Sequence, residues 1–278
     1  ESLGYHFATI SDHVLLTADV RSRYPEPFFD AYATLAWLAG QTHHIKLGTT
    51  VIVVPYRHPV LMARLGANLD NLSGGRFIFG VGVGSRESEY NALGIPFHQR
   101  GAIANEYLAA IKLLWTSQTA SFKGKHIELS DVSGIRTHQT PHPPIWVGGL
   151  SDGALKRAIR LGDAWHPSRF KLDWLLKTGL PRIRLLAEEA GRPTPPLAPR
   201  IKMTITDTPL PDDTRNPGQG TLDQVRRDVE ALHAVGATHV LLDWYDDDLE
   251  VTRHHEVGWH TLALLAEKVF DLGHETLR

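Results

Sequence analysis

Short apolar, β-branched segments alternate along this chain with longer segments of helical spacing. The pattern predicts strands over 6–11, 45–54, 77–83, 145–148, 163–166, 201–206 and 239–244. It predicts helices over 29–42, 59–72, 101–115, 151–161, 172–190, 221–235 and 257–271. The strand over 45–54 is apolar on both faces, as is typical of a parallel strand that is covered on both sides. This alternation favours βαβ units around a parallel sheet.

The fold class that we expect is α/β, and the expected architecture is a (β/α)8 TIM barrel formed by a single domain over residues 1–278. An eighth strand would precede Glu1, so the first strand of the barrel is expected to be missing from this chain. A doubly wound sheet is the competing architecture, and the lack of a dinucleotide fingerprint at the start of the chain disfavours it.

Two segments interrupt the alternation of strands and helices. Residues 116–144 contain the sequence Ser121–Ile127, which predicts a small inserted hairpin that turns at Gly124. Residues 208–220 are rich in proline, aspartate and glycine, which predicts a loop with the composition of a mobile segment.

Composition excludes several classes of function. The 278 residues carry a formal net charge of -2 without a basic block, so we expect neither nucleic acid nor a membrane as a partner. The chain has no cysteine, which excludes disulfides, thiolate chemistry and cysteine-ligated metals and is typical of a cytoplasmic protein. No apolar run approaches the roughly 20 residues that span a bilayer.

Histidines follow two of the predicted strands, at the ends where barrel enzymes place their chemistry. Asp12 and His13 follow the first strand, and a carboxylate beside an imidazole can hold a cofactor edge or move a proton. The alternative is that Asp12 caps the next segment and His13 is a surface residue. His166 ends another strand and is predicted to face the barrel mouth, unless it is a structural histidine with satisfied hydrogen bonds.

Glycines mark two further strands. Gly48 lies inside a β-branched run, where glycine indicates a bulge, the close approach of a ligand or tight packing. The run from Gly80 to Ser85 alternates glycine with valine, so that a flat ring or a phosphate could approach the backbone. Tight packing between the strand and its loop would explain that run equally well, and it does not match a dinucleotide or Walker motif.

The segment from Val147 to Ser151 has the features of an anion site. A strand ends there in Gly148 and Gly149, and Ser151 opens the next helix. Free backbone N–H groups and the helix dipole attract anions at such a turn, so we predict that it binds a phosphate. A role of Ser151 as an ordinary helix cap is compatible with this prediction.

No metal site is expected. His254, His255 and His260 do not have the spacing of a zinc-binding helix, because the last histidine lies one residue too far along the chain. The acidic run Asp246–Asp248 could bind a divalent cation, but a solvated acidic loop is the favoured interpretation.

Together, these segments resemble the luciferase-like monooxygenase superfamily, and within it the branch that depends on coenzyme F420. The segments that carry the resemblance are Ser11–His13, Leu47–Val51, Pro55–Pro59, Leu69–Asp70, Leu72–Arg76, Gly80–Gly84, Glu89, Leu93–Gly94, Arg100, Pro143–Gly149 and Leu161–His166. Each motif is weak alone, but their shared order is specific. The chain departs from the family in the short segment Arg23–Pro27. It also has Ser85 where the sugar-phosphate dehydrogenase of the superfamily has an acid, so we do not infer that substrate.

The resemblance implies a usually dimeric barrel with the cofactor ring in its mouth. It implies a non-prolyl cis peptide at Thr50–Val51 in a bulge that supports the ring, with Thr49 beside it. The cofactor-binding residues that it implies, together with the phosphate site predicted above, are Asp12, His13, Thr49, Thr50, Val51, Gly82, Val83, Gly84, Val147, Gly148, Gly149 and Ser151.

The reaction that we expect is hydride transfer between F420 and a small organic substrate in a cytoplasmic homodimer. His13 is the first candidate for proton transfer and His166 the second. Two alternatives stay open: an FMN-dependent monooxygenase that uses molecular oxygen on the same fold, and a non-catalytic flavin-binding protein. The substrate and the direction of transfer do not follow from the sequence.

Overall fold

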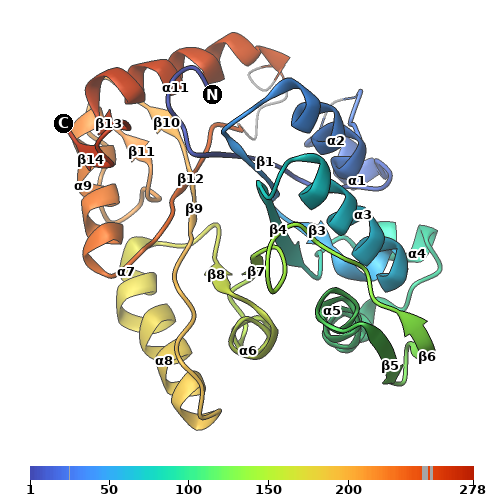
Figure 1. Ribbon diagram of the computed structural model, residues 1–278. Helices are drawn as coiled ribbons and strands as arrows, with labels where there is room; N and C mark the ends of the chain where they lie inside the picture. Colours follow the sequence, from blue (N-terminus) through green and yellow to red (C-terminus); the bar gives the residue numbers. More distant parts are fainter. Residues whose placement is uncertain (25, 246–249, 251–252) are drawn as a thin grey trace. The chain divides into compact units, whose positions relative to one another are not determined.

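The computed structural model of the chain describes residues 1–24, 26–245, 250 and 253–278. It divides into two compact units, which we describe separately (Figure 1). The amino-terminal unit comprises residues 6–148 and 161–163. The carboxy-terminal unit comprises residues 1–5, 149–160 and 164–278.

The amino-terminal unit is built on parallel strands. Its strands are β1 (Phe7–Ile10), β2 (Lys46–Thr49), β3 (Ile52–Val53), β4 (Phe77–Gly82), β5 (Thr119–Lys123), β6 (Glu128–Ser133) and β7 (Ile145–Gly148). Its helices are α1 (Ala18–Arg21), α2 (Ala31–Gln41), α3 (Pro59–Leu72), α4 (Glu87–Ala92) and α5 (Arg100–Thr116), with short 3-10 turns η1 (Val54–Tyr56) and η2 (Phe97–Gln99). Strand β1 pairs with β2, and β2, β3 and β7 all pair with β4, each in parallel. The α/β fold with parallel strand pairing is therefore confirmed.

The inserted hairpin is also confirmed. Strands β5 and β6 pair antiparallel over the segment that was predicted to turn at Gly124. Helix α3 has the predicted bounds and begins with Pro59, where proline is favoured because the first helical N–H needs no partner within the helix.

A bulge interrupts the strand that was predicted to run unbroken over 45–54. Before the bulge Gly48 pairs with Ile78, and after it Ile52 pairs with Val81. Three residues on one side, 49–51, therefore face two on the other, 79 and 80, which is the definition of a bulge. The peptide bond between Thr50 and Val51 is cis, as the family resemblance implied.

Alternate glycines of β4 and its loop make room for this bulge. Gly80 and Gly82 face the same way because side chains alternate along a strand, and Gly84 follows in the loop. A Cβ atom on Gly80 would lie 1.7 Å from the carbonyl oxygen of Thr49, and one on Gly82 would lie 2.5 Å from Cγ2 of Val51. Gly84, with φ +63°, would place a Cβ 2.9 Å from Cγ1 of Val53. Tight packing therefore accounts for this glycine pattern.

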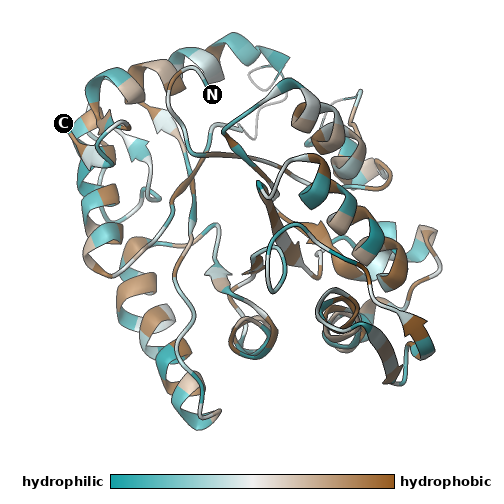
Figure 2. Cartoon of the chain, in the orientation of Figure 1, coloured by the Kyte–Doolittle hydropathy of each residue, from teal (hydrophilic) through white to brown (hydrophobic). Residues whose placement is uncertain are grey.

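The carboxy-terminal unit has shorter strands. They are β8 (Ala164–His166), β9 (Arg200–Lys202), β10 (Thr204–Ile205), β11 (Gln219–Gly220), β12 (Leu241–Asp243), β13 (Phe270–Asp271) and β14 (Thr276–Leu277). The helices are α6 (Asp152–Leu161), α7 (Leu172–Trp174), the π-helical segment η3 (Leu175–Gly179), α8 (Leu180–Glu189), α9 (Leu222–Ala234) and α11 (His255–Lys268). Helices α8 and α9 alternate between hydrophobic and hydrophilic stretches, as helices that cover a core do (Figure 2).

Several predicted elements of this unit have different bounds in the structure. The strand expected over 201–206 divides into β9 and β10 at Met203, whose N–H binds the carbonyl oxygen of Asp243. The helix expected over 257–271 ends at Lys268, because Phe270–Asp271 turns back and pairs antiparallel with Thr276–Leu277. The intervening Gly273 was the sequence signal for that turn.

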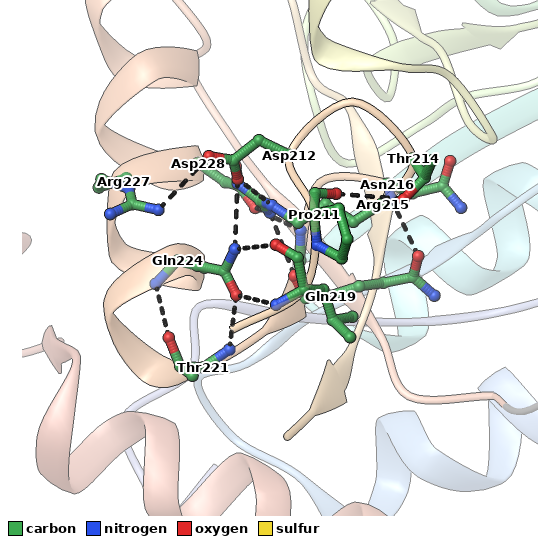
Figure 3. Close-up of polar contacts among 12 residues, drawn as sticks. Pro211, Asp212, Thr214, Arg215, Asn216, Gln219, Thr221, Gln224, Arg227 and Asp228 are labelled. Atoms are coloured by element: carbon green, nitrogen blue, oxygen red, sulfur yellow. Dashed lines mark hydrogen bonds and ion pairs between the residues drawn. The ribbon is translucent and has the colours of Figure 1, made fainter. Parts of the chain in front are cut away.

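The loop expected over 208–220 is tied firmly to α9 (Figure 3). Arg215 donates two hydrogen bonds to the buried carboxylate of Asp228, at 2.6 and 2.8 Å, and the N–H of Gly218 donates a third at 2.8 Å. Gln224 both donates to and accepts from the backbone of Leu210. These contacts are those of an ordered loop, because charge-assisted bonds to a buried carboxylate are strong. The prediction of a loop is confirmed except at its end, Gln219–Gly220, which forms β11.

No helix in the described part of the chain is both long enough and apolar enough to cross a membrane.

The close approach at Gly80 gives a testable prediction. We expect Gly80→Ala to lower the free energy of unfolding by roughly 1–3 kcal/mol or more, because a methyl group there overlaps the Thr49 carbonyl. Urea denaturation measures the loss. Gly40→Ala is the matched control, since a Cβ at this position of α2 has no neighbour within 4 Å. Equal stability of the two variants would contradict the role of Gly80.

Candidate functional site

In the amino-terminal unit, the buried carboxylate of Asp12 joins the end of β1 to the segment that follows the bulge. Oδ2 accepts hydrogen bonds from the N–H of Val53 at 3.0 Å and from Arg57 at 2.8 Å, and Oδ1 accepts a second bond from Arg57 at 2.8 Å. Arg57 also binds Asp30, the residue that caps α2. Burial by itself would lower the pKa of Arg57, but the hydrogen bonds and charge of Asp12 raise it above its ordinary value. Both oxygens of Asp12 are thus engaged within the protein.

His13 lies beside a second buried carboxylate, that of Glu89 on α4. Its Nδ1 is 2.8 Å from Oε2 of Glu89, and the N–H of Val14 donates to Oε1 at 3.2 Å. The hydroxyl of Tyr56 donates to Oε2 at 3.3 Å. Burial raises the pKa of Tyr56 well above its usual range, and the negative charge of Glu89 raises it further. Tyr56 therefore stays protonated and acts as a donor to Glu89.

Two aromatic rings pack against His13. The ring centroids of Tyr24 and Phe28 lie 4.6 and 5.5 Å from that of His13. The side chain of His13 keeps 13% of its surface exposed, so its imidazole is partly shielded but still reached by solvent. An imidazole in such a place can exchange a proton with a bound molecule.

The bulge lies at the end of β1, close in the chain to Asp12 and His13. The N–H of Thr50 binds the carbonyl oxygen of Ile10 at 2.8 Å. The buried hydroxyl of Thr49 donates to the carbonyl oxygen of Gly80 at 2.6 Å. Val51 is half-buried and contacts the position of Gly82. Three hydrogen-bonded strands therefore hold this piece of backbone in place.

The other predicted residues of this unit lie at the ends of β4, which pairs with both sides of the bulge, and of β7, which also pairs with β4. The carbonyl oxygen of Val83 accepts a hydrogen bond from the hydroxyl of Tyr90 at 2.5 Å. Val147 is buried and pairs with Val81, and Gly148 ends β7. Thus Asp12, His13, the bulge and the Gly82–Gly84 loop share one end of the parallel strands.

In the carboxy-terminal unit, Gly149 and Ser151 lie at the start of α6. Gly149 has φ +116°, and its carbonyl oxygen accepts a hydrogen bond from the indole of Trp165 at 2.8 Å. A Cβ on Gly149 would lie 2.8 Å from Cβ of Ala154, so only glycine fits. The hydroxyl of Ser151 accepts a long bond of 3.4 Å from the N–H of Ala154, as a helix cap does. The phosphate site at this turn stays a prediction.

His166 is buried in the carboxy-terminal unit, with 2% of its surface exposed. Its Nδ1 lies 2.5 Å from the carbonyl oxygen of Ala198, which can only accept, so Nδ1 carries the hydrogen. Burial lowers the pKa of His166 to about 4, against the raising effect of that hydrogen bond. A buried, neutral imidazole favours the structural interpretation of His166, and its catalytic role stays a prediction.

Sequence reasoning assigned no role to Glu89, Tyr56 or Arg57, although all three lie in segments of the family resemblance. The sequence pattern could not show that Glu89 is buried. Helix α4 contains both the exposed Glu87 and the buried Glu89, and its six residues are too few to define a helical face. Asp246–Asp248, considered above as a cation site, lie outside the described residues. Among the residues that are described, no cluster of three or more histidine and acidic side chains could hold a metal ion.

The burial of His166 predicts how stability depends on pH. Because the folded pKa of about 4 lies below the ordinary value of 6.5, the unfolded chain binds more protons between these values. The stabilisation is complete above pH 6.5 and is lost as the pH falls towards 4, by roughly 3 kcal/mol in total. Urea unfolding across this range should show a flatter pH dependence in His166→Asn, whose amide can replace Nδ1 as a donor. Parallel profiles for both proteins would contradict the prediction.

Comparison with known proteins places the chain in a family. The model of the family described as luciferase-like monooxygenase matches residues 1–216. An uncharacterised protein of Mycobacterium tuberculosis is 30% identical over 211 residues, which cover 70% of this chain and 71% of the relative. An F420-dependent glucose-6-phosphate dehydrogenase of Kineococcus radiotolerans is 32% identical over 197 residues, which cover 69% of this chain and 57% of the relative.

Solved structures agree on the fold. An F420-dependent secondary alcohol dehydrogenase matches with a TM-score of 0.77 at 17% identity, over 96% of this chain and 90% of the other. The oxygenating constituent of 3,6-diketocamphane monooxygenase of Pseudomonas putida, in complex with FMN, matches with a TM-score of 0.72 at 18% identity, over 96% and 88%. The chain therefore belongs to the luciferase-like monooxygenase family, as an oxidoreductase of the class that depends on F420 or a flavin.

Proposed function

We propose that this protein transfers a hydride between coenzyme F420 and a small organic substrate. The observation that carries the proposal is the pairing of His13 with the buried Glu89 at 2.8 Å, at the end of the strands where the bulge lies. A buried carboxylate that orients an imidazole is an arrangement suited to proton transfer. The 32% identity to a relative named as an F420-dependent dehydrogenase supports F420 over FMN as the cofactor. We propose the (β/α)8 barrel as the fold, in a single domain.

The residues present fit a deazaflavin. Such a cofactor needs a rigid backbone surface for its flat ring and a polar group near the reacting carbon. Hydrogen bonds to Ile10 and Gly80 hold the bulge at Thr49–Val51. Just after the bulge, the N–H of Val53 donates to Asp12, the residue that precedes His13. We infer that the bulge supports the ring and that Asp12 acts by holding the bulge in register.

Bound F420 would supply or accept the hydride. The protein contributes the proton step. In the direction of substrate oxidation, Nε2 of His13 takes the proton from the substrate hydroxyl. The hydride leaves the carbon that bears this hydroxyl. In the reverse direction the same nitrogen returns the proton to the oxygen. Tyr24 and Phe28 narrow the surroundings of the imidazole, which limits the access of water to it.

The cofactor is tested by reconstitution. We expect the purified protein to bind F420 more tightly than FMN, and to change the absorbance of the deazaflavin when a secondary alcohol or a ketone is added. Because general acid–base catalysis typically contributes about 10²–10⁴-fold, His13→Gln should lower kcat by that factor and leave the Kd for F420 within about threefold of wild type. Exclusive binding of FMN with consumption of oxygen would instead identify a flavin monooxygenase. Binding without turnover in a screen of such substrates would support a flavin-binding protein.

We also propose a homodimer in the cytoplasm. Large apolar side chains are exposed on the neighbouring helices α2 and α3: Trp37 is 65% exposed, Leu61 51% and Leu72 68%. Exposed apolar residues on packed helices are typical of a surface that is covered by a partner. Light scattering should give twice the chain mass, and Trp37→Glu should shift the protein towards the monomer. A wild-type monomer at micromolar concentration would contradict the proposal.

A further inference from the structure

Glu89 is a buried acid whose two oxygens are both engaged by hydrogen bonds. Its side chain is 1% exposed, and two donors and the Nδ1 atom of His13 converge on its two oxygens. The N–H of Val14 can only donate, and the hydroxyl of Tyr56, which stays protonated, donates to the other oxygen. An ionised carboxylate has only acceptor sites, so it accepts from Val14, from Tyr56 and from a hydrogen on Nδ1 of His13.

This arrangement determines the hydrogen on His13. Because Glu89 accepts, Nδ1 of His13 must carry the hydrogen that points to it, and Nε2 is left as the nitrogen that can take up a proton. A simple structural role for Glu89, to tie α4 to the segment after β1, would need only the bond from Val14. That role would not depend on the negative charge or on which nitrogen of His13 is protonated.

We propose that Glu89 is a positioning residue that fixes the tautomer of His13 and stabilises the imidazolium that forms during proton transfer. The proposal rests on the proposed function, in which His13 moves the proton. When the O–H bond of the substrate breaks, its proton goes to Nε2, and the electron pair of the adjacent C–H bond leaves as the hydride to F420. The positive charge that appears on His13 is then paired with the carboxylate of Glu89 at 2.8 Å.

The tautomer can be measured without turnover and without any cofactor. In wild-type protein with isotopically labelled histidine, the ring-nitrogen shifts of neutral His13 should show a hydrogen on Nδ1 and none on Nε2. The resonance is assigned by its loss in His13→Gln. Glu89→Gln should give a mixture of tautomers, and Glu87→Gln, an exposed position on the same helix with the same change of charge, should match wild type. A hydrogen on Nε2 in the wild type overturns the proposal, and this measurement decides the tautomer even if Glu89→Gln does not fold.

Kinetics separates this proposal from the proposed function. With F420 and a substrate, Glu89→Gln should lower kcat by at least about tenfold and leave the Kd for F420 within about twofold of wild type, because the charge acts through His13. Glu89→Asp, which keeps the charge, should recover part of the loss. Wild-type kcat in Glu89→Gln overturns the positioning role alone. Absence of F420 turnover by the wild-type enzyme overturns the proposed function and the catalytic part of this inference together, while the tautomer measurement still stands.

Discussion

The close approach of the Thr49 carbonyl to Gly80 is the constraint on which the amino-terminal unit depends. A side chain of any size at Gly80 would occupy the space of that carbonyl, 1.7 Å from the position of a Cβ. Only because β4 has glycine there can the strand beside it hold an extra residue and still resume its pairing at Ile52. The bulge changes which residues face the end of the sheet. Asp12 holds the strand in this register by accepting a hydrogen bond from the N–H of Val53. Bulges commonly re-aim side chains near active sites in this way.

Two buried carboxylates, Asp12 and Glu89, lie at this end of the strands and have different partners. Asp12 binds Arg57 and the backbone, and it holds structure in place. Glu89 binds an imidazole that solvent can reach, and this contact carries the proposed proton transfer. Neither charge could stay buried without its partners, because an unpaired ion in the interior costs several kcal/mol. The difference between them lies in the partner: a guanidinium keeps its charge at all ordinary pH values, whereas an imidazole can gain and lose one.

The strand–helix order followed from the sequence because apolar periodicity reports burial directly, and the bounds of α3 were predicted as they stand. Interruptions were harder to predict. The break between β2 and β3 depends on a neighbour about thirty residues away, Gly80. The break at Met203 is the point where the strand changes its partner from β12 to β11. For the site, the histidine was visible at its strand end. Glu89 was visible only as part of the family resemblance, because the helical pattern of α4 does not separate it from Glu87. The hydrogen bond from His166 to the carbonyl oxygen of Ala198 likewise joins residues far apart in the chain, which sequence spacing does not reveal.

Arg57 has a consequence for how this site could be moved or redesigned. One guanidinium joins the carboxylate under the bulge to Asp30, the exposed cap of α2. The carboxylate at the start of α2, Asp30, and the buried carboxylate of Asp12 therefore share one cation, Arg57. A graft of these strands onto another scaffold that left α2 behind would keep the buried Asp12–Arg57 pair but lose its second acceptor. A transplanted piece would therefore need the start of α2 in addition to β1, the bulge and β4. Substitutions at Asp30 would affect Asp12, which it does not contact directly, through the shared Arg57.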